Sequence, residues 1–264
     1  GCTHPELLDR AAATARDAGE VERSLALTKQ ALAESPSDGP GRADPAVIKR
    51  WVEKGQRLSG LMRPGAIDAL QTAAALLPDD AEPRFRAQIL DQLATVSMLA
   101  GHLRIDIARR AVAAAVEAGH AVAESYARNT LGSCLVAAGE EQAGIAELIR
   151  SGELARGSRG ALLRYCINYS DVLTLTGRYA DAVEVALSGV EVAADLGLER
   201  STGAMLAGNA AEPLIALGQW ERADQLIGRS LELDPPAHHR AHLRLLRCWL
   251  RLWTGRLGDA EAIL

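Results

Sequence analysis

Aromatic residues are scarce in this sequence. Only 3% of its 264 residues are Phe, Trp or Tyr, and a single Phe is present. Aromatic and β-branched runs of strand length are also missing, whereas Ala and Leu, which favour helices, are abundant. The composition therefore predicts an almost purely helical protein.

Cysteine usage excludes a disulfide framework or a zinc site as the basis of the fold. The four cysteines, Cys2, Cys134, Cys166 and Cys248, are far apart and none belongs to a CxxC pair. We expect reduced and mostly buried thiols in a cytoplasmic protein.

The chain also lacks an excess of positive charge and a long apolar run. Its net charge is −5, which argues against direct binding to nucleic acid or to an acidic membrane surface. No apolar segment approaches the length of a membrane span, so no membrane contact is expected. No signal peptide is visible, and because the sequence starts at Gly1, its natural N-terminus is expected to lie upstream.

Catalytic and cofactor motifs are missing as well. The sequence contains no GxSxG, HExxH or glycine-rich phosphate loop. The stretch "HHRAH" places His238 and His242 one helical turn apart, but carboxylate support nearby is lacking. A solvated first turn of a helix is favoured there over a metal site. We therefore expect no enzyme activity, no metal and no cofactor in this segment.

A repeat is the dominant positive signal. Seven glycines each follow an apolar helical stretch: Gly19, Gly60, Gly101, Gly139, Gly177, Gly218 and Gly255. Their successive spacings are 41, 41, 38, 38, 41 and 37 residues. Regular spacing of this size is typical of a helical solenoid.

Each unit is predicted to be a helix, a tight glycine turn and a second antiparallel helix. The residue two positions after the glycine is apolar in six of the seven units, Trp220 being an example. The residue five positions after is small in six of the seven, as at Ala182 and Ala223, and Asp106 is the exception. We expect this small residue where the two helices cross closely.

These offsets resemble the second half of the tetratricopeptide repeat, although that repeat has a period of about 34 residues. The resemblance implies an all-α, right-handed superhelical solenoid of about seven helix pairs, with residues 1–264 forming a single repeat domain.

A narrower resemblance covers most of the chain. The stretches "NYSDVL" (168–173), "GNAAEPLIALGQW" (208–220), "ARNTLGSCL" (127–135) and "LLDRAAATARDAGEVERSLALTKQAL" (7–32) resemble the repeat region of large ATP-binding regulators of the LuxR family, the class of the maltose-regulon activator. The resemblance implies an upstream ATP-hydrolysing module and a downstream helix-turn-helix domain that contacts DNA. Neither is in this sequence, which we therefore interpret as a fragment.

Polar residues of the first helices are the candidate binding residues. In tetratricopeptide arrays one face of these helices lines a groove. Counting back from the turn glycines places seven residues there: Asn129, Ser133, Arg164, Asn168, Asp171, Asn209 and Glu212. Asparagines in successive repeats could hold a peptide backbone or a polar ligand, because an amide both donates and accepts. Alternatively, they bond backbone groups between helices, above all Asn209, which lies four residues before Pro213.

Trp249 and Trp253 are candidates for self-association, since they lie four residues apart on the first helix of the last pair. The alternative is that both pack inward on the preceding unit. The resemblance to LuxR-family regulators implies a non-catalytic sensor and assembly region that binds a protein partner or a small-molecule inducer. The alternative function is a free-standing adaptor that binds a peptide of a partner protein.

Overall fold

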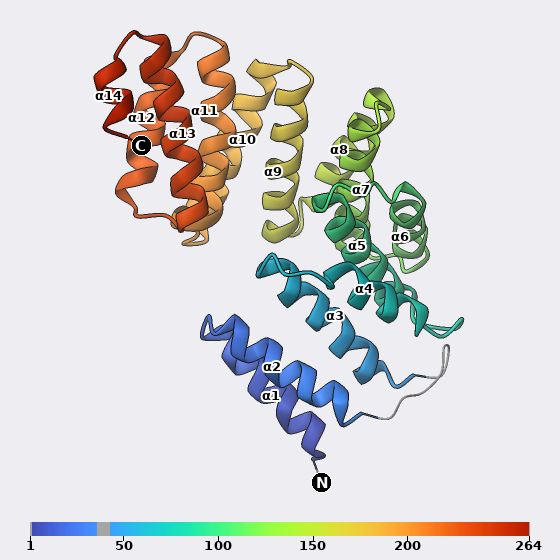
Figure 1. Cartoon of the computed structure of the whole chain (residues 1–264). Helices are drawn as coiled ribbons and strands as arrows, with labels where there is room; N and C mark the ends of the chain where they lie inside the picture. Colours follow the sequence, from blue (N-terminus) through green and yellow to red (C-terminus); the bar gives the residue numbers. More distant parts are fainter. Residues whose placement is uncertain (1, 36–42, 264) are drawn as a thin grey trace. The chain divides into compact units, whose positions relative to one another are not determined.

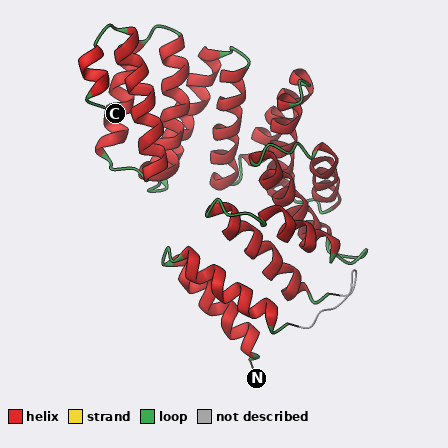
Figure 2. Cartoon of the chain, in the orientation of Figure 1, coloured by secondary structure: helices red, strands yellow, loops and turns green. Residues whose placement is uncertain are grey.

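A computed structural model describes residues 2–35 and 43–263 of the chain. Within these ranges it contains fourteen α-helices and no strand (Figures 1 and 2). The first helices of the pairs are α1 (His4–Asp17), α3 (Pro45–Gly60), α5 (Pro83–Leu99), α7 (Ala121–Ala137), α9 (Arg159–Leu175), α11 (Ala204–Ala216) and α13 (Ala237–Trp253). The second helices are α2 (Val21–Ala33), α4 (Ala66–Ala75), α6 (Ile105–Glu117), α8 (Glu141–Ala155), α10 (Tyr179–Asp195), α12 (Trp220–Glu232) and α14 (Leu257–Glu261). A π-helical turn, η1 (Glu199–Gly203), leads into α11.

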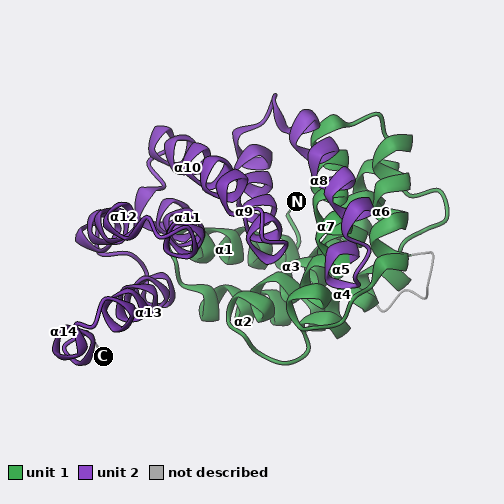
Figure 3. Cartoon of the chain, turned by 90° about the horizontal axis from the view of Figure 1, so that it is seen from above, with its two compact units in different colours: residues 1–134 green, residues 135–264 purple. Residues whose placement is uncertain are grey.

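The chain divides into two compact units, residues 1–134 and 135–264, and the boundary falls within α7 (Figure 3). In each unit, consecutive helices pack on one another: α1 to α6 show this in the first unit, and α8 to α14 in the second. In the second unit the first helices α9, α11 and α13 also contact one another in succession. This neighbour-to-neighbour packing is the pattern of a helical repeat.

Glycine makes six of the seven predicted turns. Gly19, Gly101, Gly139, Gly177, Gly218 and Gly255 have φ between 72° and 87°. A side chain with a Cβ adopts such left-handed backbone only under strain, which explains glycine at the end of a first helix.

The predicted turn at Gly60 is wrong. Gly60 is the last residue of α3, and the left-handed backbone falls on Met62 (φ 50°) and on Gly65 (φ 88°). The loop between α3 and α4 is therefore longer than in every other pair except α5 and α6, and Pro64 lies inside it. A count based on glycine alone could not detect this shift.

The position of the small residue in each repeat is set by the start of the second helix and not by the glycine. Gly65 precedes α4 and Asp106 is exposed, so neither occupies the expected helix crossing. The fourth residue of every second helix is instead small and buried. These residues are Ser24, Ala69, Ala108, Gly144, Ala182, Ala223 and Ala260. The predicted close packing holds for all seven pairs once the longer turns before α4 and α6 are counted.

Glycines inside helices allow further close approaches in the second unit. A Cβ added at Gly189 of α10 would lie 2.7 Å from Cβ of Cys166 on α9 and 2.9 Å from Leu206 on α11. A Cβ at Gly152 of α8 would lie 2.6 Å from the Tyr165 ring on α9. Neighbouring backbones therefore approach more closely than any larger residue would permit.

Candidate functional site

The candidate groove residues fall in both compact units. Asn129 and Ser133 belong to residues 1–134, and the other five belong to residues 135–264. The two sets are therefore described separately.

In the first unit the predicted contacts do not form an open binding face. Asn129 is 1% exposed, so its placement on an accessible groove surface is wrong. Ser133 is half-buried, and its hydroxyl donates to the Asn129 carbonyl at 3.1 Å. The neighbouring Thr130 hydroxyl donates to Asp91 Oδ1 at 2.5 Å. These side chains form a buried polar layer between α5 and α7.

In the second unit Asn209 has a structural role. Its Nδ2 donates to the Ile167 carbonyl and to Ser170 Oγ, both at 3.1 Å, and so connects α11 to α9. This confirms the alternative in which Asn209 bonds a backbone group of another helix. Arg164 and Asn168 are half-buried on α9 and have interactions of their own.

Asp171 and Glu212 differ from the other candidates because both are exposed and lie in the same register. Each lies six residues before the turn glycine of its pair, Gly177 or Gly218, and their helices α9 and α11 are in contact. Among the described residues neither carboxylate has a hydrogen bond or an ion pair. These two side chains are the accessible polar groups of this first-helix face.

The surroundings of Asp171 destabilise its charge. Desolvation by neighbouring atoms raises the pKa of Asp171, and the Glu212 carboxylate raises it further. The side chain is nevertheless exposed to solvent. The carboxylate therefore has neighbouring groups around it and also reaches water. Such a position favours an incoming positive charge or hydrogen-bond donor.

Trp249 continues the same register on α13, six residues before Gly255. Its side chain is 41% exposed and that of Trp253 is 61% exposed, so the alternative in which both indoles pack fully inward is wrong. A Cβ added at Gly208 of α11 would lie 3.0 Å from Nδ1 of His242, which shows how closely α13 approaches α11. Successive first helices therefore present an acid, an acid and an indole.

Burial also shifts the pKa of two cysteine thiols and of one histidine among the described residues. Burial raises the pKa of Cys134 to about 11, with a contribution from the Asp91 charge, and burial alone raises that of Cys166 to about 11. Both thiols are therefore protonated at neutral pH and are poor nucleophiles. Desolvation lowers the pKa of His239, and its neighbours His238 and His242 lower it further.

Within the described ranges the structure offers no candidate metal site and no candidate membrane span. No group of three or more His, Cys, Asp or Glu there could hold a metal ion. None of the helices described has both the length and the apolar character required to cross a bilayer.

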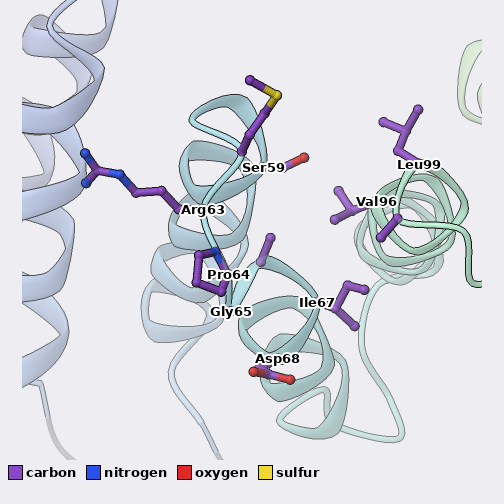
Figure 4. A pocket seen from close by; sticks show the side chains of 11 residues that line it. Ser59, Arg63, Pro64, Gly65, Ile67, Asp68, Val96 and Leu99 are labelled. Carbon is purple, nitrogen blue, oxygen red and sulfur yellow. The ribbon is translucent and has the colours of Figure 1, made fainter.

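Sequence reasoning missed a shallow pocket of about 600 Å³ between the α3–α4 loop and the end of α5 (Figure 4). Ile67, Val96 and Leu99 form its apolar wall, whereas Arg63 points away from them (Figure 4). Arg63 lies 3.9 Å from Glu22 of α2. We predicted the turn at Gly60, but the loop that lines this pocket begins one residue later. The predicted turn therefore gave no indication of the pocket.

Comparison with known proteins identifies the fold and no closer relationship. No family model and no curated protein matches the chain. A tetratricopeptide repeat protein from Parabacteroides merdae aligns with a TM-score of 0.60 and 14% identity, over 98% of this chain and 90% of that one. The apo form of RapI aligns with a TM-score of 0.63 and 12% identity, over 99% of this chain and 74% of that one. A Rap protein in complex with the Competence and Sporulation Factor aligns with a TM-score of 0.62 and 11% identity, over 98% and 86%. The chain therefore has an all-α, tetratricopeptide-like repeat fold.

Proposed function

We propose that this chain is a non-catalytic interaction domain whose second unit binds a donor-rich segment of a partner protein. The observation that carries this proposal is the exposed and unpaired pair Asp171 and Glu212 on adjacent first helices. A Rap protein of similar fold has been solved in complex with the Competence and Sporulation Factor, and that complex supports a binding role for such repeats.

The chemistry of the face favours donors over acceptors. Asp171 and Glu212 offer only acceptor oxygens when ionised, and Asn209 uses its amide nitrogen within the protein. The carboxylates of Asp171 and Glu212 repel each other in the free protein. A Lys or Arg side chain of the partner would bring a positive charge that compensates this repulsion. Binding would therefore relieve an electrostatic cost that exists in the free protein.

The finer proposal is that the chain is the sensor and assembly region of a LuxR-type transcriptional regulator. The sequence stretches around Asn168–Leu173 and Gly208–Trp220 support it. In this mechanism the signal, a protein or a small-molecule inducer, favours one arrangement of the repeats, typically with about 1–3 kcal/mol of coupling. ATP and DNA would be bound by modules outside this sequence, and the regulator would act in the cytoplasm.

A free-standing adaptor is the second candidate function. One observation favours it: the alignment covers 90% of the Parabacteroides merdae protein, a chain that consists almost entirely of matched repeat structure. Reading the intact gene tests the two candidates. A nucleotide-binding loop upstream and a helix-turn-helix downstream would support the regulator, whereas stop codons close to both ends would support the adaptor.

Binding itself is tested with fluorescein-labelled nonapeptides of basic, neutral and acidic composition. We expect the basic peptides to bind most tightly and their affinity to fall with added salt. Asp171→Asn and Glu212→Gln should each weaken basic-peptide binding by about tenfold, the scale of a charged contact.

Glu184→Gln is the matched control, because Glu184 is an exposed acid on the second helix α10. It removes the same charge from a different face and should leave affinity unchanged. Equal binding of all peptides would contradict the proposal, as would a Glu184→Gln effect as large as that of Asp171→Asn.

A further inference from the structure

Lysine is rare in this chain, and its few lysines lie close together in the sequence. Lys29, Lys49 and Lys54 are the only three among 29 Lys and Arg residues. Lys29 belongs to α2, and the other two belong to α3, a helix that packs on α2. All three therefore lie in one part of the first compact unit.

The arginines of α3 and of the loop after it have acidic partners. Their nitrogen–oxygen distances are 2.8 Å between Arg50 and Asp9, 3.3 Å between Arg57 and Glu53, and 3.9 Å between Arg63 and Glu22. The three lysines differ, because among the described residues none of them has an ion pair or a side-chain hydrogen bond. Even Glu53, the acid next to Lys54 in the sequence, is engaged by an arginine.

Lys54 is held against an indole. Its Nζ lies 4.1 Å from the centre of the Trp51 ring, one helical turn earlier on α3. Both side chains are half-buried, whereas Lys29 is exposed on α2. A cation over the face of an indole is attracted by the negative face of the ring. The contact therefore positions the Lys54 ammonium group without neutralising its charge.

Lys29 and Lys54 act on each other as like charges across the contact between α2 and α3. Desolvation lowers the pKa of Lys54, and the Lys29 charge lowers it further. Two neighbouring positive charges repel each other, and an anion placed between them would turn this repulsion into two attractions. The position is therefore suited to a negatively charged group.

We propose that Lys29 and Lys54 bind a phosphate monoester group at the contact between α2 and α3. Such a group carries about −1.5 to −2 charges at pH 7, which matches two ammonium groups. A single carboxylate would leave one of the two lysines uncompensated. Lysine binds phosphate as a point charge, and its three N–H donors suit the terminal oxygens of the group. The half-buried Trp51 indole keeps water from one side of Lys54, which strengthens the attraction.

This site is independent of the acidic pair in the second unit. Lys29 and Lys54 belong to residues 1–134, whereas Asp171 and Glu212 belong to residues 135–264. The two sites also select opposite charges. Failure of one proposal therefore leaves the other standing.

The small number of lysines makes a direct test possible. In the full chain, isotope labelling of lysine at Cε gives one side-chain carbon signal for each of the three residues. Inorganic phosphate and a nonapeptide with one phosphoserine are titrated in at neutral pH. We expect the Lys29 and Lys54 signals to shift. The pH at which Lys54 titrates should also rise, because a bound anion stabilises the ammonium form.

Lys29→Gln and Lys54→Gln should each weaken binding of the phosphopeptide by about tenfold, the scale of one charged contact. Lys49→Gln is the matched control, because Lys49 is an exposed lysine about 140° around the same helix from Lys54. It should leave the affinity unchanged. Each variant also assigns its own NMR signal, and circular dichroism should show native helix content in all three.

Two results would support the site and distinguish the source of the phosphate. Tighter binding of the phosphopeptide than of inorganic phosphate would indicate a phosphorylated segment of a partner protein, and equal affinity would indicate a free phosphate compound. Three results would overturn the inference: lysine signals that respond to neither probe, equal binding of the unphosphorylated peptide, or a Lys49→Gln effect as large as that of Lys54→Gln.

Discussion

At the scale of single residues, the useful distinction is between polar groups that hold helices together and those left for a partner. Asn209 bonds Ile167 and Ser170 across a helix boundary, and Asn129 is buried. Asp171 and Glu212 have no such role among the described residues. In the sequence all four of these polar residues were candidate ligand contacts. Only their burial and hydrogen bonding in the structure distinguish the structural residues from the accessible ones.

The Asp171 charge is expected to cost stability. Its pKa is raised in the folded protein by desolvation and then by Glu212, so the native state binds more protons than the unfolded state above the ordinary value of 3.8. Stability due to this group should therefore fall as the pH rises from that value through the raised pKa.

Asp171→Asn removes the charge, and we expect it to increase the free energy of unfolding at pH 7 by about 0.5 kcal/mol, the scale of exposed charge pairs. Urea unfolding at pH 7 and near pH 3.5 measures the effect, which should shrink at the lower pH. Glu184→Gln serves as the control and should show no such pH-dependent gain. A variant less stable than the wild type at pH 7 would assign Asp171 a structural role.

At the scale of elements, the second helix of each pair is defined by a small fourth residue. Ala182 is 0% exposed at this position of α10, where it shares a core cluster with Leu173 of the first helix α9 and with Leu148 of α8. Alanine suits such a crossing because any longer side chain would separate the helix axes.

Ala182→Leu should lower the free energy of unfolding by roughly 1–3 kcal/mol through overpacking. Ala180→Leu is the matched control, since Ala180 is exposed on the same helix and its replacement should stay within about 0.5 kcal/mol. Thermal and urea unfolding of the two variants give the comparison. Equal stability of both would mean that the crossing does not lie at Ala182.

At the scale of the whole molecule, stability is expected to be distributed locally. Each helix contacts mainly its neighbours along the chain, and the contacts separate into residues 1–134 and 135–264. In an array of this kind a disturbance weakens the adjoining repeats far more than distant ones.

Gly189→Ala tests this locality, because its new Cβ would lie within 3.0 Å of Cys166 and Leu206. Hydrogen exchange should show lost protection in α9, α10 and α11 and unchanged protection in α1 to α4. Gly60→Ala is the control: no atom lies within 4 Å of an added Cβ there, and no such loss should occur. Uniform loss over all helices would instead indicate that the chain unfolds as one cooperative unit.

Several features of the fold followed from local signals. Helix formers, regular glycine spacing and small residues at one register predicted seven helix pairs, because each signal acts within a single pair. The errors came where a loop lengthened: the α3–α4 turn lies after Gly60, and α6 begins four residues after Gly101. A fixed count from glycine has no means of detecting an added loop residue.

The candidate site could be predicted only in part. The sequence placed Asp171 and Glu212 on a groove face and identified Asn209 as a potential bond between helices, but it gave Asn129 the same status as Asp171. Which residue of a helix reaches solvent depends on how the neighbouring helices rotate and pack, and that rotation is not encoded in the spacing within one repeat.

The sequence by itself determined the all-helical repeat, since helix propensity, turn glycines and small crossing residues are properties of short segments. Tertiary structure alone decided two further features: the bonds that Asn209 makes to α9, and the desolvated but accessible carboxylate of Asp171. Each of these depends on what a neighbouring helix covers, and only the packed structure specifies that.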